Sequence, residues 1–164
     1  AYFDLDTVPT DFQSPFVSDS NFTTTPLVRV QSLYYAMMSL PVMTANQLST
    51  MNVMSYSFRS IYNIKIWGWV SQEDDQRRVL IINKDLTPTL SGNVVICNGG
   101  NSRAKYYYLQ APTLTEKTQI KFQGYTMNYT VSGRFEAGTL ENFYVDPVDG
   151  CYSIPIAYSQ AAFV

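Results

Sequence analysis

A period of two in the apolar residues, sustained over most of the chain after residue 53, is the feature that most constrains the fold. Turn-forming stretches such as DLTPTLSG and NGGNS separate the apolar runs at spacings of roughly 10–14 residues. This pattern predicts an antiparallel β-sandwich over residues 41–164. Because Pro155 cannot donate a ladder hydrogen bond, we expect the last strand to lie at an edge or to contain a bulge. The expected strands are Met54–Ile61, Asn63–Val70, Arg77–Lys84, Asn93–Asn98, Lys105–Pro112, Thr118–Met127, Thr139–Val145 and Cys151–Val164.

One segment ahead of these strands has a helical pattern instead. Thr25 can cap a helix and Pro26 suits its first turn. Pro41 predicts its end, so we expect a helix over Pro26–Leu40. Apolar residues cover about two-thirds of its circumference, whereas a helix on one surface needs an arc of only about 100°. We therefore expect it to have neighbours on two sides. Residues 1–25 show no period and predict an extended lead-in.

Charge and hydropathy together argue against two classes of protein, nucleic-acid binders and membrane-spanning proteins. Charged residues make up 15% of the chain and the formal net charge is −2, which argues against a nucleic-acid binder with clustered Lys and Arg. The dense basic pair Arg77-Arg78 follows the acidic run Glu73-Asp74-Asp75 and predicts a solvated hairpin tip of mixed charge. The sequence has no apolar run near 18 residues, so we expect no membrane span.

The residue types also limit the chemistry. The chain has no histidine, which removes Ser-His-Asp and Cys-His catalysis and the usual zinc ligand sets. Glycoside hydrolysis needs two carboxylates held roughly 5–10 Å apart, but nearly all carboxylates here fall in expected turns or in the lead-in. The segment DPVDG at 146–150 predicts a hairpin turn rather than a calcium loop. We therefore assign no catalytic, cofactor or metal-binding residue.

Two aromatic clusters are candidates for stacking against sugars. Alternation along a strand places Trp67 and Trp69 on one face of their strand, and Tyr106 and Tyr108 on one face of theirs. Either pair can form a binding platform or pack in the core, and the core is the commoner use of such residues. Packing is therefore the first expectation for these four residues, and sugar stacking is the alternative.

The two cysteines and two sequons bear on the compartment. Cys97 and Cys151 each lie in a strand-like stretch, and they form either one disulfide or two buried thiols. In a secreted protein we favour the disulfide, which would stabilise the fold by roughly 2–4 kcal/mol. Asn21 and Asn128 begin Asn-x-Thr sequons and are candidates for N-glycosylation. We expect an extracellular location.

Four stretches, taken in order, resemble one known protein family. They are LVRVQSLYYAMMSL, VLIINKDL, YYLQAPTLTEKTQIKFQGYTM and YSIPIAYSQAAFV. Their order and spacing resemble the C-terminal region of glycoside hydrolase family 79, the β-glucuronidase and heparanase-like enzymes, with fungal-type members nearest. Val79–Lys84 resembles a sandwich strand of that family. Leu109–Leu114, followed by Gln123-Gly124, resembles the family's Leu-x-Ala-Pro pattern and its later glycine.

In that family a (β/α)8 barrel precedes a β-sandwich, so the resemblance implies that Pro26–Leu40 is the last helix of a barrel. Ser32 stands where the family pattern has proline. The two catalytic glutamates of the family lie on barrel strands, and no segment of this chain matches that region. The resemblance therefore brings no catalytic residue to this chain.

The resemblance implies a non-catalytic C-terminal sandwich module that supports the catalytic barrel of a retaining glycosidase. The alternative is a stand-alone secreted β-sandwich that binds glycans or protein, or that serves as a structural matrix component. In either case the apolar helix needs a cover. We expect the barrel, or a partner in a homo-oligomer, to cover the helix residues Leu33, Tyr34, Met37 and Met38.

Overall fold

The computed structural model describes residues 16–18, 28–30, 32–44, 51–53, 63–72, 75–87, 91–97, 100–116, 119–126 and 138–164. The predicted sandwich is confirmed: two antiparallel sheets pack face to face, and one helix precedes them in the described part of the chain. The elements are β1 (Phe16–Ser18), β2 (Val28–Val30), α1 (Ser32–Thr44), β3 (Met51–Val53), β4 (Ile64–Ser71), β5 (Arg77–Asn83), β6 (Gly92–Cys97), β7 (Ala104–Gln110), β8 (Lys121–Phe122), β9 (Phe143–Val145), β10 (Cys151–Ile156) and β11 (Gln160–Phe163).

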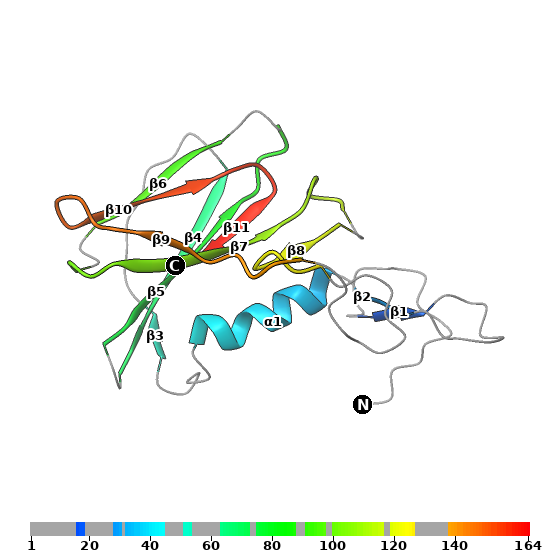
Figure 1. Cartoon of the computed structure of the whole chain (residues 1–164), viewed down its shortest axis with the longest axis horizontal. Helices are drawn as coiled ribbons and strands as arrows, with labels where there is room; N and C mark the ends of the chain where they lie inside the picture. Colours follow the sequence, from blue (N-terminus) through cyan, green and yellow to red (C-terminus); the bar gives the residue numbers. More distant parts are fainter. Residues whose placement is uncertain are drawn as a thin grey trace.

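The larger sheet contains seven strands. Its order is β3-β4-β5-β11-β7-β8, and β9 pairs with the first part of β7. β6 and β10 form the second sheet of the sandwich, and β1 pairs with β2. The last strand, β11, therefore lies between β5 and β7 in the middle of the larger sheet (Figure 1).

Alternation along the central strands gives the larger sheet two apolar faces. In β5, Val79 and Ile81 point towards the second sheet, while Leu80 and Ile82 point the other way. The side chains of β7 and β11 alternate in the same manner. Both sets are apolar, because these strands are central and covered on both sides. This explains the nearly continuous apolar runs of these strands in the sequence.

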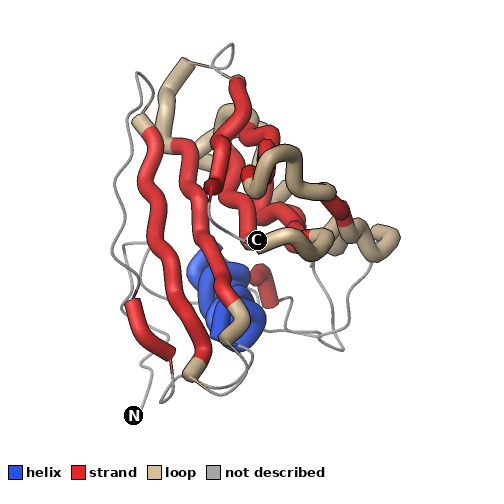
Figure 2. Tube along the Cα trace, turned by 90° about the vertical axis from the view of Figure 1, so that its left-hand side faces the viewer, coloured by secondary structure: helices blue, strands red, loops and turns tan. Residues whose placement is uncertain are grey.

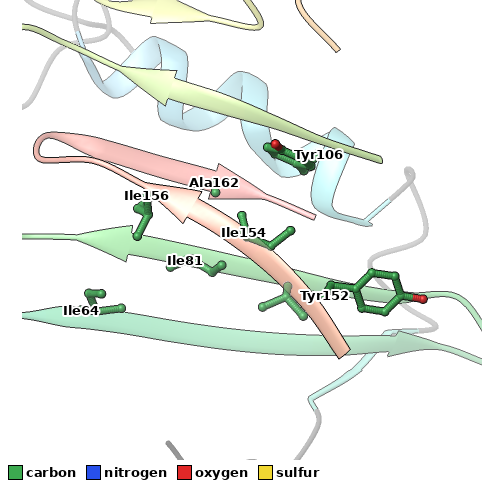
Figure 3. Packing of buried hydrophobic residues seen from close by; sticks show 8 residues of the cluster. Ile64, Ile81, Tyr106, Tyr152, Ile154, Ile156 and Ala162 are labelled. Atoms are coloured by element: carbon green, nitrogen blue, oxygen red, sulfur yellow. The ribbon is translucent and has the colours of Figure 1, made fainter. Parts of the chain in front are cut away.

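The main core lies between the two sheets. Ile81 and Ala162 of the larger sheet meet Ile154 of β10, and all three are fully buried (Figure 3). The cluster is completed by residues from β4, β5, β7 and β10, namely Ile64, Val79, Tyr106, Tyr152 and Ile156. Burying one isoleucine side chain contributes roughly 1.5–3 kcal/mol, so this cluster is the main source of cohesion between the sheets.

A second core lies under helix α1, on the opposite face of the larger sheet. Tyr35 of the helix is 1% exposed and packs with Phe122 and Phe163. Tyr34 and Met38 flank this contact and are half-buried. Figure 2 shows the helix lying against the strands of the sheet, so the helix covers one face while β6 and β10 cover the other.

The helix begins and ends later than the sequence predicts. It covers Ser32–Thr44 instead of Pro26–Leu40, and Val28–Val30 forms β2. Two β-branched residues in alternation favour a strand, and Phe16–Ser18 supplies a partner for it. Pro41 lies inside the helix, where its missing N–H removes one hydrogen bond to the carbonyl of Met37. Pro41 and Met37 both lie on the exposed side of the helix.

The predicted single strand Cys151–Val164 is also wrong, because the segment forms two strands that belong to different sheets. β10 pairs with β6, and β11 pairs with β5 and β7. The connection contains Ser159 with φ of 59°, and its carbonyl accepts a hydrogen bond from the Ala111 amide. No glycine or asparagine marks this corner, so the local sequence gives no sign of it. Pro155 lies in β10, whose one partner among the described strands is β6, as expected for an edge.

The disulfide between Cys97 and Cys151 is confirmed. The two residues lie directly opposite each other in the β6–β10 pair, so the bond links two neighbouring strands of the second sheet. The hairpin predicted at DPVDG is confirmed as well. Val148 and Cys151 exchange two backbone hydrogen bonds around Asp149 and Gly150, and both turn residues have positive φ.

Candidate functional site

The structure places the two pairs of candidate sugar-binding aromatics on opposite faces of the larger sheet. Tyr106 is 8% exposed and stacks on Phe143 between the sheets, with ring centroids 5.4 Å apart. Tyr108 lies beside them and donates a hydrogen bond of 2.5 Å to the Pro155 carbonyl. Burial raises the pKa of the Tyr108 hydroxyl well above its usual range. Both tyrosines thus pack within the sandwich.

The tryptophans of β4 lie on the face that carries helix α1. Trp69 packs at the margin of the second core, and Trp67 is 37% exposed. The four aromatics therefore do not form one platform. Trp67 retains an accessible ring, and glycan binding by this residue stays a prediction. The glycosylation candidates Asn21 and Asn128 lie outside the described residues.

The helix residues expected to need a partner are divided between two environments. Tyr34 and Met38 already pack against the sheet of this chain, whereas Met37 is 52% exposed. The side chain of Leu33 lies outside the described set. Ala36, Met37 and Pro41 are the exposed side chains among the described helix residues, and cover of the helix by a partner stays a prediction.

A cleft of about 750 Å³ opens at the end of the larger sheet where β11 stops. β11 ends at Phe163, and Val164 exchanges two backbone hydrogen bonds with Val79 of β5. β5 and β7 continue past this point, so the first residues of both strands line the cleft together with Val164. In Figure 1 the chain end marked C lies among the strands of the larger sheet, and Val164 is one of the residues that line the cleft.

Basic side chains dominate the lining of the cleft. Arg77 and Arg78 come from β5, while Arg103 and Lys105 come from β7 and the residue before it. Asp75 is the one carboxylate side chain among the described lining residues. The local sequence around Arg77-Arg78 predicts a solvated hairpin tip and gives no sign that this pair lines a cleft with Arg103 and Lys105, because strand order is not visible in local patterns.

Arg103 is held in place by a two-pronged ion pair. Its Nε and an Nη atom each donate a 2.8 Å hydrogen bond to the two carboxylate oxygens of Asp146. The bonds from Arg103 hold the pKa of Asp146 below its usual range and raise the pKa of Arg103. Both side chains are more than 60% exposed, at 62% and 65%, so the pair orients Arg103 more than it stabilises the fold.

Tyr107 forms the floor of the cleft on the helix side. It stacks on Phe163 and meets Phe122 edge-on, with centroids 5.8 and 5.9 Å apart. The Lys105 ammonium lies 6.0 Å from the centroid of the same ring. Burial raises the pKa of the Tyr107 hydroxyl, and the positive charge of Arg78 opposes this shift. The ring thus lies close to the cationic group of Lys105.

On the side of the second sheet, Tyr152 fixes the loop that borders the cleft. Its hydroxyl lies 2.7 Å from the Ser102 carbonyl and 3.2 Å from the Gly100 carbonyl, and it donates to them. Gly100 has φ of 102°, a conformation that glycine adopts without strain. This anchoring keeps the wall of the cleft in one position.

The residues that line the cleft could bind an anion. No group of three His, Cys, Asp or Glu side chains able to hold a metal ion exists among the residues that the structure describes. In the same residues, no helix is both long and apolar enough to cross a membrane. Cationic side chains around an open cleft can instead attract and orient an anionic group.

The comparisons with known proteins give a likeness at the level of structure. No model of a known protein family matches the sequence, and no curated protein matches it. Among solved structures, the chain is similar to a 4-O-α-L-rhamnosyl-β-D-glucuronidase from Fusarium oxysporum 12S, crystallised with Rha-GlcA, with a TM-score of 0.52 and 16% identity. The match covers 69% of this chain and 25% of that enzyme, so the chain spans about a quarter of its length. At this identity the likeness establishes a shared fold.

Proposed function

We propose that this chain is the non-catalytic C-terminal β-sandwich module of a family-79-like glycoside hydrolase of the β-glucuronidase type, and that it supports a catalytic barrel. One observation carries the proposal. The chain aligns over 69% of its own length with only 25% of a fungal glucuronidase, as expected of one domain of such an enzyme. The ordered sequence resemblance to the C-terminal region of family 79 is the reason to assign the chain to the C-terminal domain of such an enzyme.

The chemistry of the described residues supports a non-catalytic role. A retaining glycosidase needs an acid/base and a nucleophile, two carboxyl groups about 5–5.5 Å apart in one cleft. The cleft at the end of β11 has Asp75 as its one described carboxylate side chain, and its other charged groups are cationic. We therefore place the catalytic carboxylates of the parent enzyme in the barrel.

Helix α1 offers the contact between module and barrel. Its inner face packs on the sheet through Tyr35, and its outer face exposes Met37. A barrel packed over this outer face, or a second copy in a homo-oligomer, would bury Met37 and give the helix its second neighbour. Leu33, Tyr34 and Met38 would border that contact.

An extracellular location is part of the proposal. The Cys97–Cys151 disulfide is typical of proteins that fold in an oxidising compartment. The sequons at Asn21 and Asn128 would be used in the same compartment in a eukaryotic host.

Two measurements test the proposal. The purified 164-residue chain should hydrolyse an aryl β-glucuronide no faster than buffer, and measurable turnover that survives repurification would refute the non-catalytic role. Denaturing mass measurement of the native protein should show a species well above 18.6 kDa.

A native species of 18.6 kDa would instead favour the alternative, a stand-alone secreted sandwich that binds glycans or protein or serves in a matrix. The exposed ring of Trp67 is the observation that favours glycan binding in that case. Glycan-array binding that Trp67→Ala abolishes, with the fold retained, would support it.

A further inference from the structure

We propose that Cys97 is a site of thiol–disulfide exchange, at which the thiolate of a small external thiol attacks the Cys97 sulfur of the folded protein and opens the bond to Cys151. This site does not depend on the function proposed above. Support comes from the face of the second sheet that carries the bond, from the backbone pairing around it, and from what flanks each sulfur atom.

The disulfide lies on the outer face of the second sheet. In β10, Tyr152 and Ile154 point into the core between the sheets (Figure 3). The alternate positions of both strands face outwards, and on β6 the side chain of Val95 is 59% exposed. Cys97 lies two residues further along that face and is exposed, while its partner Cys151 is half-buried. Solvent therefore reaches the bond without any movement of the core.

The backbone pairing allows the bond to open without loss of the sheet. Cys151 exchanges two backbone hydrogen bonds with Val148 in the hairpin, so its N–H and C=O point away from β6. Cys97 and Cys151 are thus a pair without backbone hydrogen bonds between them, and the ladder between β6 and β10 begins at the next pair, Ile96 and Tyr152. Cleavage of the disulfide breaks none of these ladder bonds. We therefore expect the bond to open in the folded protein.

The surroundings of the two sulfur atoms differ. Exchange is a displacement at sulfur, so the attacking thiolate approaches one sulfur from the side opposite the other. Val148 lies directly opposite Cys151 in the hairpin, so its side chain projects from the same face and stands beside the Cys151 sulfur on the side away from Cys97. On the other side, β10 is the one partner of β6 among the described strands. Cys97 therefore carries the sulfur that is more open to attack.

The exchange balances in atoms and electrons. The external thiolate forms an S–S bond with the Cys97 sulfur while the bond to Cys151 breaks, and the Cys151 sulfur leaves as a thiolate that takes a proton from water. A second external thiolate then displaces the Cys97 sulfur from the mixed disulfide. Both cysteines end as thiols, and two external thiols are oxidised to one disulfide. The ratio of reduced to oxidised small thiol around the protein therefore sets how much of it is open.

The test treats the folded wild-type chain with reduced glutathione, stops samples with acid, alkylates the free thiols and locates the glutathione by peptide mass spectrometry. In early samples we expect at least about tenfold more glutathione on Cys97 than on Cys151. The rate of opening should be proportional to the glutathione concentration and unchanged by urea below the unfolding transition. It should lie within about a hundredfold of the rate for a disulfide in an unstructured peptide, whereas opening through global unfolding would be slower than in the peptide by at least about a thousandfold, because so little of a small domain is unfolded.

Three variants separate attack on the folded protein from attack on the unfolded chain. Ile81→Ala weakens the core at a distance from the sulfurs and should leave the rate unchanged, whereas opening through unfolding would become faster by about thirtyfold or more. Val148→Ala should raise the share of label on Cys151 at least about threefold, and Val95→Ala, the same change on β6, should not. Equal labelling of the two sulfurs, no effect of Val148→Ala, or a rate that rises with Ile81→Ala and with urea would each overturn the proposal.

Discussion

Removal of the disulfide should lower the free energy of unfolding by about 4 kcal/mol. Cys97 and Cys151 are 54 positions apart. In the chain-entropy relation, a closed loop of that length reduces the entropy of the unfolded chain by about 14 cal/mol/K, which is about 4 kcal/mol at 25 °C. Because small domains have a total stability of roughly 5–15 kcal/mol, this loss would be a large part of it.

The double variant Cys97→Ala/Cys151→Ala isolates this effect, because it leaves no thiol behind. Cys97 is exposed and Cys151 half-buried, so loss of the sulfur atoms removes little packing. Urea unfolding followed by tryptophan fluorescence gives the free energy and its slope with urea concentration. The slope should rise, since an uncrosslinked unfolded chain exposes more surface.

Reduction of the wild-type protein under the same conditions is the matched control and should give the same loss. A decrease of less than about 1 kcal/mol in both experiments would contradict the argument from loop length. It would mean that the unfolded chain keeps the segments of β6 and β10 close together without the bond.

Three further measurements test the packing and the buried hydroxyl. Ile81→Ala, at a fully buried position, should cost about 2–5 kcal/mol in urea unfolding, whereas Val95→Ala, at a position 59% exposed, should cost less than about 1 kcal/mol; equal losses would refute the assigned core. Gly124→Ala should destabilise more than Gly100→Ala, because both have positive φ but a Cβ at Gly124 would meet a backbone oxygen 2.2 Å away while Gly100 faces open space. Burial raises the pKa of Tyr108, so the unfolded chain releases its phenolic proton first as the pH passes about 10; stability should fall above that pH, and Tyr108→Phe should make the fall shallower.

Local periodicity was sufficient to predict the strands of the core. The alternation of Val79, Leu80, Ile81 and Ile82 in the sequence is the alternation of the two apolar faces in the structure. The hairpin at Asp149-Gly150 was also visible, because this pair of residues favours the positive φ values of a tight turn. These features depend on neighbours within a few residues, and the sequence records such neighbours directly.

The sequence does not show, in the same way, where an element begins or ends when a strand that is distant in the sequence sets that limit. The segment at Val28–Val30 has both a helical and a strand interpretation, and its pairing with Phe16–Ser18 decides between them. The corner before Gln160 likewise depends on where β11 can pair, since no turn residue marks it. Tertiary pairing overrides local preference at both places.

The basic cleft depends entirely on such non-local order. Arg77 and Arg78 are separated from Arg103 and Lys105 by all of β6 and its connections, and the two pairs meet because β11 enters the sheet between β5 and β7 and stops short. The strand order β5-β11-β7 therefore brings these four basic residues to the lining of one cleft, although no local pattern in the sequence links them.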